Sequence, residues 1–596
     1  MTSKRRFPAA LERSTPDHFI DPRIKLLEAY ADEARLIILL LLVTVLIPSA
    51  SGLAASRTAS PQDPTLLTFQ ALGPGIALPP AASGIALTLS FSYTPEQEKT
   101  ADPKSQSGKD DQAAVPAPRL QKNTGRALFE IGSMMMYSQI RYWINYSKFI
   151  EDWQFHLSWK DQKRRFFTFE ANLFDSNSFR LNWTHAFSGA LYYTFARTNH
   201  LSWPQSLLFS TGGSLWWEYI AEWREVISLN DNIITSFGGY STGEPWFQLG
   251  KYFIGREGYF NRILSFINPI MKLNHWIDGK QGKNLSLGPE PGWHLFRLFL
   301  GQGNMPASSG VGPRNNVITG FHTQIIHLPD YGKTGKTGRM VMDTLASSLD
   351  LDFAFLHGHI EEANFATRVV GLGYFKQDID ANSRGYAYYF GLGSAFTLFK
   401  KKSVAFYDSS SVPVKQGVDL HLQEPREFRD KLSVVHVLGP SFDFTKFSPA
   451  SRLRLVLDAT LDFGLINSYA LNKYSIGRDL TGIKTTLLYY GYYYGFGTTL
   501  SSGLTYSVHS LEFNGLVRYQ AYGSLDGLDR FQKEITDDFH LRDTRLIYRI
   551  GAAFRIPGTP VEIHGHYEGI DRRGVIKDTR HRNLEHRYAL FMSYTF

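Results

Sequence analysis

The chain has 596 residues, a formal net charge of +8 and no cysteine, which excludes disulfide bonds and thiolate metal sites. Aromatic residues make up 14% of the sequence, with 51 Gly in addition, a composition that suits the aromatic girdles and crowded walls of a membrane β-barrel. After residue 60 no apolar run approaches the roughly 20 residues that a membrane-spanning helix needs. The positive charge is modest for this length and spread along the chain, so we expect no nucleic-acid partner.

The first segment has the pattern of an export signal. Residues 36–47 are apolar except for Thr44, follow Arg35, and precede the small residues of 49–55. A short apolar run between basic and small residues is typical of a secretory signal and is too short for a stable membrane span. We predict an export signal over residues 1–55, cleaved near residues 50–56. A signal anchor in the inner membrane is the alternative.

The next two segments are predicted from their composition and alternation. Residues 56–125 are dominated by Pro, Ala, Ser, Gln and Lys, so we predict a disordered linker that could reach a periplasmic partner. Residues 126–177 are predicted to hold the first barrel strands, at 128–144, 153–159 and 165–173.

Between residues 178 and 280 the pattern changes to helical spacing. Residues 181–199 predict one helix, and Pro204 suits the first turn of a second, because proline loses no helical hydrogen bond there. A third segment opens at Asn230, and a fourth, 259–276, is interrupted by Pro269. We predict a helical subdomain inserted in a barrel sequence. It could fill the lumen, cap one mouth or pack against the barrel.

The helical segment carries an ordered set of motifs. They are Asn182-Trp183-Thr184-His185, Gly189-Ala190-Leu191-Tyr192-Tyr193, Ala196-Arg197, Ser214-Leu215-Trp216-Trp217-Glu218-Tyr219, Asn230-Asp231, Gly238-Gly239 and Gly243-Glu244. Over about 100 residues this set resembles the bacterial domain-of-unknown-function 3943 family of uncharacterised outer-membrane proteins. The resemblance implies an outer-membrane setting and supplies no activity.

Ionisable residues of these motifs stand among aromatic neighbours, and two interpretations remain open. Buried charges are costly unless paired, so one interpretation is a structural network in which Arg197 pairs with Glu218 or Glu222, and His185 with a carboxylate. The predicted polar network comprises Asn182, Arg197, Glu222 and Glu244.

The other interpretation is a hydrolytic or acyl-transfer site. His185 would be the general base, Glu218 or Asp231 its orienting carboxylate, and Ser210, Ser214 or a water the nucleophile. The predicted catalytic set is His185, Ser214, Glu218 and Asp231.

A metal site is a weaker alternative. Its ligands would be His185, Glu218, Glu222 and His200, and the two glutamates have the four-residue spacing of ligands on one helix. The His-Glu-x-x-His pattern is missing from the sequence. We therefore predict no metal and no cofactor.

Residues 281–340 predict a loop and connecting strand, and residues 341–596 the remaining barrel strands. In the latter region apolar and polar positions alternate, and charges gather on one face of several strands. Such charges suit a wet lumen, whereas the inner faces of a soluble sandwich are dry. The solvated face of a soluble sheet is the alternative. Glu562, His564, His566 and Glu568 are predicted to form a polar strip in the lumen.

The final ten residues alternate without a break. Tyr588, Leu590, Met592, Tyr594 and Phe596 share one face. The pattern resembles the closing strand of outer-membrane barrels, which the insertion machinery reads, so we expect that machinery and outer-membrane lipid as partners.

The prediction is therefore an all-β transmembrane β-barrel of about 12 antiparallel strands with an inserted α-helical subdomain, in the bacterial outer membrane. The first functional hypothesis is a helical plug or gate in transport or envelope maintenance. A lipid hydrolase or acyltransferase and a structural or assembly component are the alternatives.

Overall fold

The computed structural model describes residues 121–146, 155–168, 171–174, 179–254, 256–280, 291–305, 314–401, 404–405, 426–427, 430–475, 478, 491–525 and 540–596. All of them belong to one compact unit, residues 120–596. The predicted export signal and nearly all of the predicted linker lie outside the described residues.

Twelve antiparallel strands close into a barrel. Their order around the ring is β7-β6-β4-β3-β17-β16-β15-β14-β13-β12-β11-β8, and β8 pairs with β7 to complete it. The bounds are β3 Trp293–Met305, β4 Arg314–Ile326, β6 Ala346–Leu356, β7 His359–Ile379, β8 Gly385–Lys401, β11 Lys431–Ser448, β12 Ser451–Asn467, β13 Tyr492–Val508, β14 Leu511–Ser524, β15 Leu541–Arg555, β16 Val561–Ile576 and β17 Thr579–Thr595. The predicted barrel of about 12 strands is confirmed.

Smaller strands accompany the ring. A thirteenth strand, β5 (Gly335–Val341), pairs with the last part of β7. Two short pairs stand apart from this sheet: β1 (Asn172–Leu173) with β2 (Ile227–Ser228), and β9 (Val404–Ala405) with β10 (Arg426–Glu427). The predicted loop and connecting strand over 281–340 therefore contain two strands of the ring, β3 and β4, as well as β5.

The last strand joins the two halves of the barrel. β17 pairs with β16 along its length and with β3 near its end, where Tyr588 lies opposite Asn304 and Thr595 opposite Arg297. Tyr588, Leu590 and Met592 point outward and are exposed, whereas Arg587 and Phe591 line the lumen. Their role as an insertion signal stays a prediction.

The outer surface of the barrel is apolar over a broad sector. Side chains on the lumen side of β12 are charged, as with Arg454, whereas Leu461 faces outward and is 67% exposed. The exposed outward-facing residues of β8 and β11–β17 include Phe390, Leu392, Leu457, Leu461, Phe496, Leu500, Leu504, Phe513, Val517, Ile550, Phe554, Ile563 and Leu590. An apolar exterior around a charged interior is the pattern of a barrel in lipid.

Helices precede the barrel in the chain. Their bounds are α2 Thr124–Tyr146, α3 Trp159–Phe167, α4 Phe179–Thr198, α5 Trp203–Trp216, α6 Leu229–Ile233, α7 Gly239–Ile254, α8 Tyr259–Leu264 and α9 Pro269–Lys280, with α10 (Leu471–Ser475) in a later loop. Two π-helical turns, Trp217–Ala221 and Ile234–Gly238, and a 3-10 turn, Ser265–Ile267, connect them.

The predicted first barrel strands over 126–177 are wrong. Residues 124–146 and 159–167 are helical, and among the described residues of 126–177 the one strand is the two-residue β1. The buried apolar residues Ala127, Ile131 and Met135 recur every four positions, which is a helical stripe and not a strand alternation. The helices therefore stand before the barrel in the chain and are not inserted between its strands.

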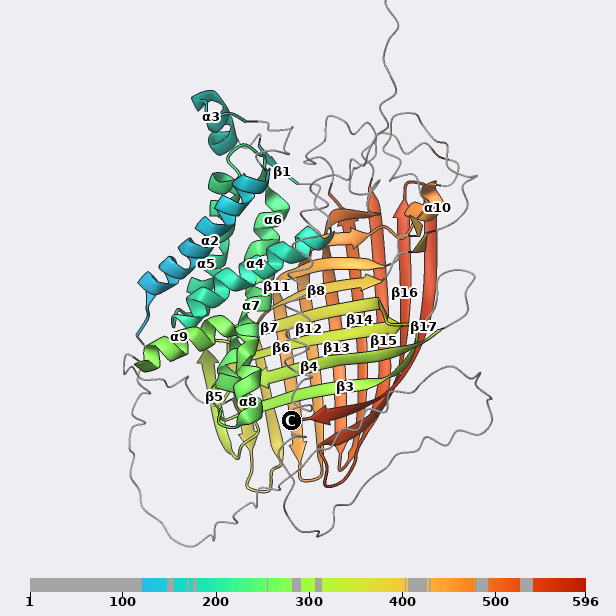
Figure 1. Cartoon of the computed structure of the whole chain (residues 1–596). Helices are drawn as coiled ribbons and strands as arrows, with labels where there is room; N and C mark the ends of the chain where they lie inside the picture. Colours follow the sequence, from blue (N-terminus) through green and yellow to red (C-terminus); the bar gives the residue numbers. More distant parts are fainter. Residues whose placement is uncertain are drawn as a thin grey trace, which may run out of the picture. The chain divides into compact units, whose positions relative to one another are not determined.

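The helical region lies against the outside of the barrel wall (Figure 1). Outward-facing Phe396 on β8 and Phe463 on β12 are fully buried, unlike their exposed counterparts elsewhere on the wall, because helical residues cover them. Trp183 packs edge-on against Phe365, and Phe174 stacks on Phe463. Among the described residues that line the lumen cavity, none comes from the helical region. The described helices therefore cover the outer wall and do not fill the cavity.

Candidate functional site

Close backbone contact assembles the motif helices. A side chain on Gly189 of α4 would come within 1.8 Å of the Thr235 carbonyl oxygen, and one on Gly239 within 2.6 Å of the Gly189 backbone. Ser210 of α5 donates from its hydroxyl to the carbonyl oxygens of Gly189 and Thr235. These glycines let α4, α5 and the second π-helical turn meet without side chains between them.

The segment 228–232 is the centre of this assembly. Ser228 caps α6, and its hydroxyl donates to Asn230 Oδ1 at 2.9 Å. Asn230 Nδ2 donates to Asp231 Oδ1 at 3.0 Å and to the Tyr494 hydroxyl on β13 at 2.8 Å. The segment is thus fixed to the barrel wall.

All four predicted catalytic residues reach this segment. His185 Nε2 lies 3.4 Å from Asp231 Oδ1, with 21% of its side chain exposed. Ser214 donates its hydroxyl to Asn232 Oδ1 at 3.0 Å, and Glu218 Oε2 accepts from the Ser228 backbone N–H at 2.9 Å. The predicted pairing of His185 with a carboxylate is confirmed, and the carboxylate is Asp231.

The exposure of these groups decides between Ser214 and a water as the possible nucleophile. Ser214 is 3% exposed and its hydroxyl is engaged with Asn232, whereas His185 keeps an open edge. Glu218 is 2% exposed, and its carboxylate accepts a hydrogen bond from the Ser228 backbone N–H rather than from the imidazole of His185. A water beside His185 therefore fits the geometry better than Ser214 as a nucleophile.

An unpredicted arginine holds the first π-helical turn. Arg165 of α3 is 1% exposed, and its guanidinium donates to the carbonyl oxygens of Tyr219 at 2.6 Å and Glu222 at 2.9 Å. Turns of this kind leave carbonyl groups without helical donors and are frequent at functional sites. In the sequence Arg165 is one basic residue of the run Lys160–Arg165, which offers no sign of its burial.

The predicted polar network divides into separate contacts. Asn182 accepts from the Ser433 hydroxyl on β11, and Glu222 accepts from the Trp217 indole N–H at 2.8 Å. Arg197 pairs with Glu244 and not with Glu218 or Glu222 as predicted, because Glu244 of α7 faces α4. The predicted partners of Arg197, Glu218 and Glu222, are therefore wrong, although Arg197 and Glu244 both belong to the predicted polar network.

Glu244 is a buried hub between the helices and the barrel. It accepts from Arg197 at 2.8 and 3.0 Å, the Tyr193 hydroxyl at 2.6 Å, Gln248 at 2.6 Å and the Thr344 hydroxyl at 2.7 Å. Burial opposes ionisation, but the Arg197 guanidinium and these donors lower the pKa of Glu244 from 4.5 to about 2.

This shift predicts a pH dependence of the free energy of unfolding. Because the pKa of Glu244 is lower in the folded state, its contribution is complete above about pH 5 and is lost as the pH falls toward 2. Wild type and Glu244→Gln should therefore differ in urea midpoint at pH 7 and converge near pH 2–3. A constant difference across this range would contradict the assignment.

The alternative metal set is not assembled. His200 lies 4.0 Å from Asp278, away from His185 and its partner Asp231. Within the described residues, no group of three or more His, Asp or Glu side chains is arranged to hold a metal ion.

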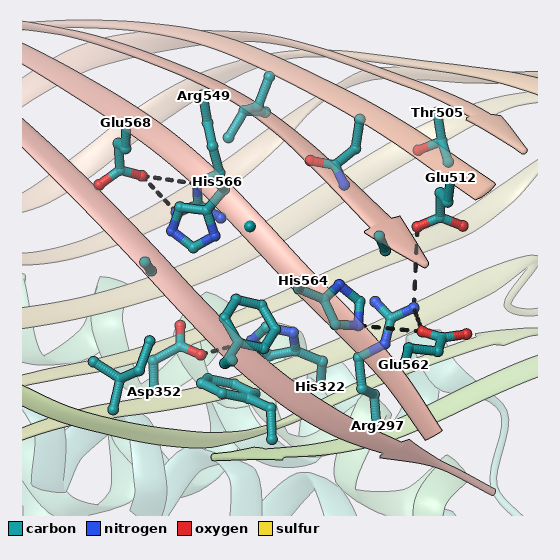
Figure 2. A pocket seen from close by; sticks show the side chains of 18 of the residues that line it. Arg297, His322, Asp352, Thr505, Glu512, Arg549, Glu562, His564, His566 and Glu568 are labelled. Atoms are coloured by element: carbon teal, nitrogen blue, oxygen red, sulfur yellow. Dashed lines mark hydrogen bonds and ion pairs between the residues drawn. The ribbon is translucent and has the colours of Figure 1, made fainter. Parts of the chain in front are cut away.

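The lumen holds a second polar site. A cavity of about 900 Å³ lies inside the barrel, and the predicted strip of Glu562, His564, His566 and Glu568 lines it as expected. Figure 2 shows these side chains facing Arg297, Arg549 and the His322–Asp352 pair. His322 Nε2 lies 2.6 Å from Asp352 Oδ1.

Ion pairs cross the lumen at one end of this cavity. Asp430 accepts from Arg545 of β15 at 2.8 Å and from Arg572 of β16 at 2.6 Å. Lys401 of β8 pairs with Glu585 of β17, a strand far from it around the ring. We call the set Glu362, Lys401, Asp430, Arg545, Arg572, Glu585 and Arg587 the lumen bridge.

The other end of the cavity also has a cross-lumen contact. Arg454 of β12 pairs with Asp443 and donates to Gln324 of β4 at 2.7 Å. Since β12 and β4 are distant in the ring, side chains fill much of the interior at this level.

A closed barrel with an apolar exterior and a charged interior defines a transmembrane β-barrel, here with helices bound to the outside of its wall. Among the described helices, none combines the length and apolarity that a membrane crossing requires. Residues 171–270 match the sequence model of a domain of unknown function, DUF3943, as the motif resemblance predicted. That match covers the helical motifs and not the barrel.

Comparison with solved structures finds several barrels. OmpT, an outer membrane protein of Vibrio cholerae, is 8% identical over 51% of this chain and 98% of its own, with a TM-score of 0.21. The KdgM porin is 9% identical over 50% and 99%, with a TM-score of 0.17. The TodX monoaromatic hydrocarbon channel is 9% identical over 52% and 91%, with a TM-score of 0.21. These values support no functional inference, and no curated protein matches the sequence significantly.

Proposed function

We propose that this protein is an outer-membrane β-barrel whose wall-bound helical region acts on membrane lipid, with the barrel as its anchor. The observation that carries the proposal is the half-open His185–Asp231 pair on a domain attached to the outer wall. A charge-paired histidine with an exposed edge is the arrangement of a general base. The apolar outer wall supports the membrane location.

Exposed apolar side chains of the helical region support a lipid substrate. Leu215 and Trp216 follow Ser214 directly, Ile220 follows Glu218 by two positions, and all three are exposed. Helix α2 adds exposed apolar residues: Leu128, Phe129, Met136, Tyr137, Ile140 and Ile144. Large apolar patches of this kind mark contact with membrane or partner, and acyl chains beside the wall would satisfy them.

The proposed reaction is hydrolysis of a lipid ester. A water donates a proton to His185 while its oxygen attacks the ester carbonyl carbon. The carbon–oxygen bond to the alcohol then breaks, and the proton on His185 passes to the departing alkoxide. Asp231 stabilises the imidazolium between the two transfers.

Replacement of His185 tests the proposal. His185→Ala should lower lipid hydrolysis by about 10²–10⁴-fold, the usual contribution of a general base, measured by release of fatty acid from vesicles of outer-membrane lipid. Asp231→Asn should lower it less, because the neutral amide still orients the ring. His200→Ala, a change two residues after the end of α4, should leave the rate unchanged.

Folding is followed in the same samples. Of the ten tryptophans among the described residues, Trp293 alone lies within a barrel strand and the others belong to the helical region, so tryptophan fluorescence reports mainly on that region. Heat-modifiable mobility reports on the barrel. A folded wild-type protein that releases no fatty acid would contradict the proposal, and a His185→Ala variant that unfolds the helices would favour the structural network.

A further inference from the structure

The lumen cavity carries more positive than negative side chains. Eight arginines and five carboxylates line it, the carboxylates being Asp352, Glu362, Glu512, Glu562 and Glu568. Each of the five lies within 4.0 Å of an arginine, lysine or histidine. The carboxylates of the lining are therefore already engaged. Outside the lining, Asp443 pairs with Arg454 and Asp430 with Arg545. Among the described residues, Arg452 and Arg518 are the lining arginines that have no carboxylate within 4.0 Å.

Arg518 is one of these two arginines. It lies on β14 opposite Ile547 of β15, so its diagonal neighbours on the same face are Arg545 and Arg549. Arg545 is held by Asp430 and Arg549 by Glu568. Arg518 has no carboxylate within salt-bridge distance among the described residues, although it faces the cavity.

A second arginine of the cavity is only partly satisfied. Arg297 of β3 pairs with Glu562 through its terminal nitrogen at 2.7 Å. Its Nε is buried and has no hydrogen-bond acceptor in the described part of the chain. Buried donors are normally paired with protein, water or ligand, so the lining offers unused donors as well as unused charge.

We propose that the lumen cavity binds a small oxyanion, a carboxylate or phosphate group, at Arg518. An arginine fork recognises both groups through paired N–H donors. The cavity volume of about 900 Å³ is that of a site for a small organic molecule. Phe299, Phe591 and Trp293 in the lining would contact an apolar body attached to the anion.

The lining also indicates where the anion enters. It extends to His509 and Ser510, in the turn between β13 and β14, and to Phe596 beyond the end of β17. At the opposite end it reaches Arg545 and Arg587 of the lumen bridge. The lining thus reaches the end at which β17 finishes, and there we place the entry of the anion, beside the Arg454–Gln324 contact. This site is independent of the proposed lipid activity, whose residues lie outside the wall.

Calorimetric titration of the folded, detergent-solubilised protein tests the site. Inorganic phosphate and benzoate are the probes, and they separate phosphate from aromatic carboxylate recognition. Arg518→Gln should weaken binding of the preferred probe at least about tenfold, since a charged hydrogen-bonded contact of about 1.4 kcal/mol or more is removed. Arg518→Lys should retain part of it.

The control is Arg573→Gln, which removes an arginine of β16 that is paired with Asp571 and is 60% exposed on its side chain. This variant should bind as wild type does, which distinguishes the site from general attraction of anions. Failure of wild type to bind either probe at millimolar concentration would overturn the proposal, as would equal binding by Arg518→Gln. Lipid hydrolysis should be unchanged in Arg518→Gln, so this result and that of His185→Ala are read separately.

Discussion

Arg197→Met should destabilise the helical region by about 3–5 kcal/mol, the usual consequence of leaving a buried charge without its partner. Arg197 is 7% exposed and Glu244 is fully buried, and the two share a bidentate contact. The variant leaves the Glu244 carboxylate with neutral donors only. Urea unfolding followed by tryptophan fluorescence measures the effect, while heat-modifiable mobility shows whether the barrel is intact.

Two further variants test whether the loss of stability in Arg197→Met comes from the unpaired buried charge of Glu244. Arg197→Met with Glu244→Met should recover much of the stability, because two apolar side chains can replace a buried ion pair. Arg339→Met breaks an exposed pair with Asp330 and should cost no more than about 1 kcal/mol. An Arg197→Met midpoint equal to that of wild type would contradict the role of this pair in joining the helices to the barrel.

The barrel was predictable because alternation is a local property of the sequence. Arg454, Asp458 and Asp462 on β12 alternate with leucines, and each side chain faces the side that its class predicts. The count of about 12 agrees with the ring although the strands predicted over 126–177 are wrong, because β3 and β4 arise within 281–340, where one connecting strand is predicted. The position of the helices was not predictable, because packing on the outer wall depends on long-range contacts such as Asn230 with Tyr494.

The errors have a common physical origin. Residues 128–144 are rich in both apolar and β-favouring side chains. The helical stripe of Ala127, Ile131 and Met135 is therefore hard to distinguish from strand alternation in the sequence. Arg197 was assigned to the wrong glutamate because Glu218, Glu222 and Glu244 are equivalent as sequence positions. Only the crossing of α4 with α7 decides among them.

The sequence also could not predict which charged residues of the lumen form ion pairs with one another. Asp430 stands just before β11, and its partners Arg545 and Arg572 follow more than one hundred residues later. Closure of the ring brings these residues together. The sequence indicates that the lumen is charged, whereas the structure shows that charges cross it.

Removing Asp430 and Glu585, two of the three carboxylates of the lumen bridge, should open the barrel to ions. In Asp430→Ala with Glu585→Ala, Arg545 of β15 loses Asp430, Lys401 of β8 loses Glu585, and Arg572 of β16 loses both. Like charges left close together in a low-dielectric space repel one another. We expect the side chains to separate, and conductance in planar bilayers to rise severalfold with a preference for anions.

The matched control changes a carboxylate of β16, the strand next to β17, on the outer face of the barrel. Asp571 of β16 accepts from Arg573 and Arg582, whose side chains are each 60% exposed, so Asp571→Ala should leave the conductance at the wild-type level. Deletion of residues 178–280 should not open the lumen either, because the helices cover the outer wall and line no part of the cavity. A pore that opens on this deletion, while the double variant stays closed, would show that the helices gate the barrel and that the lumen bridge does not.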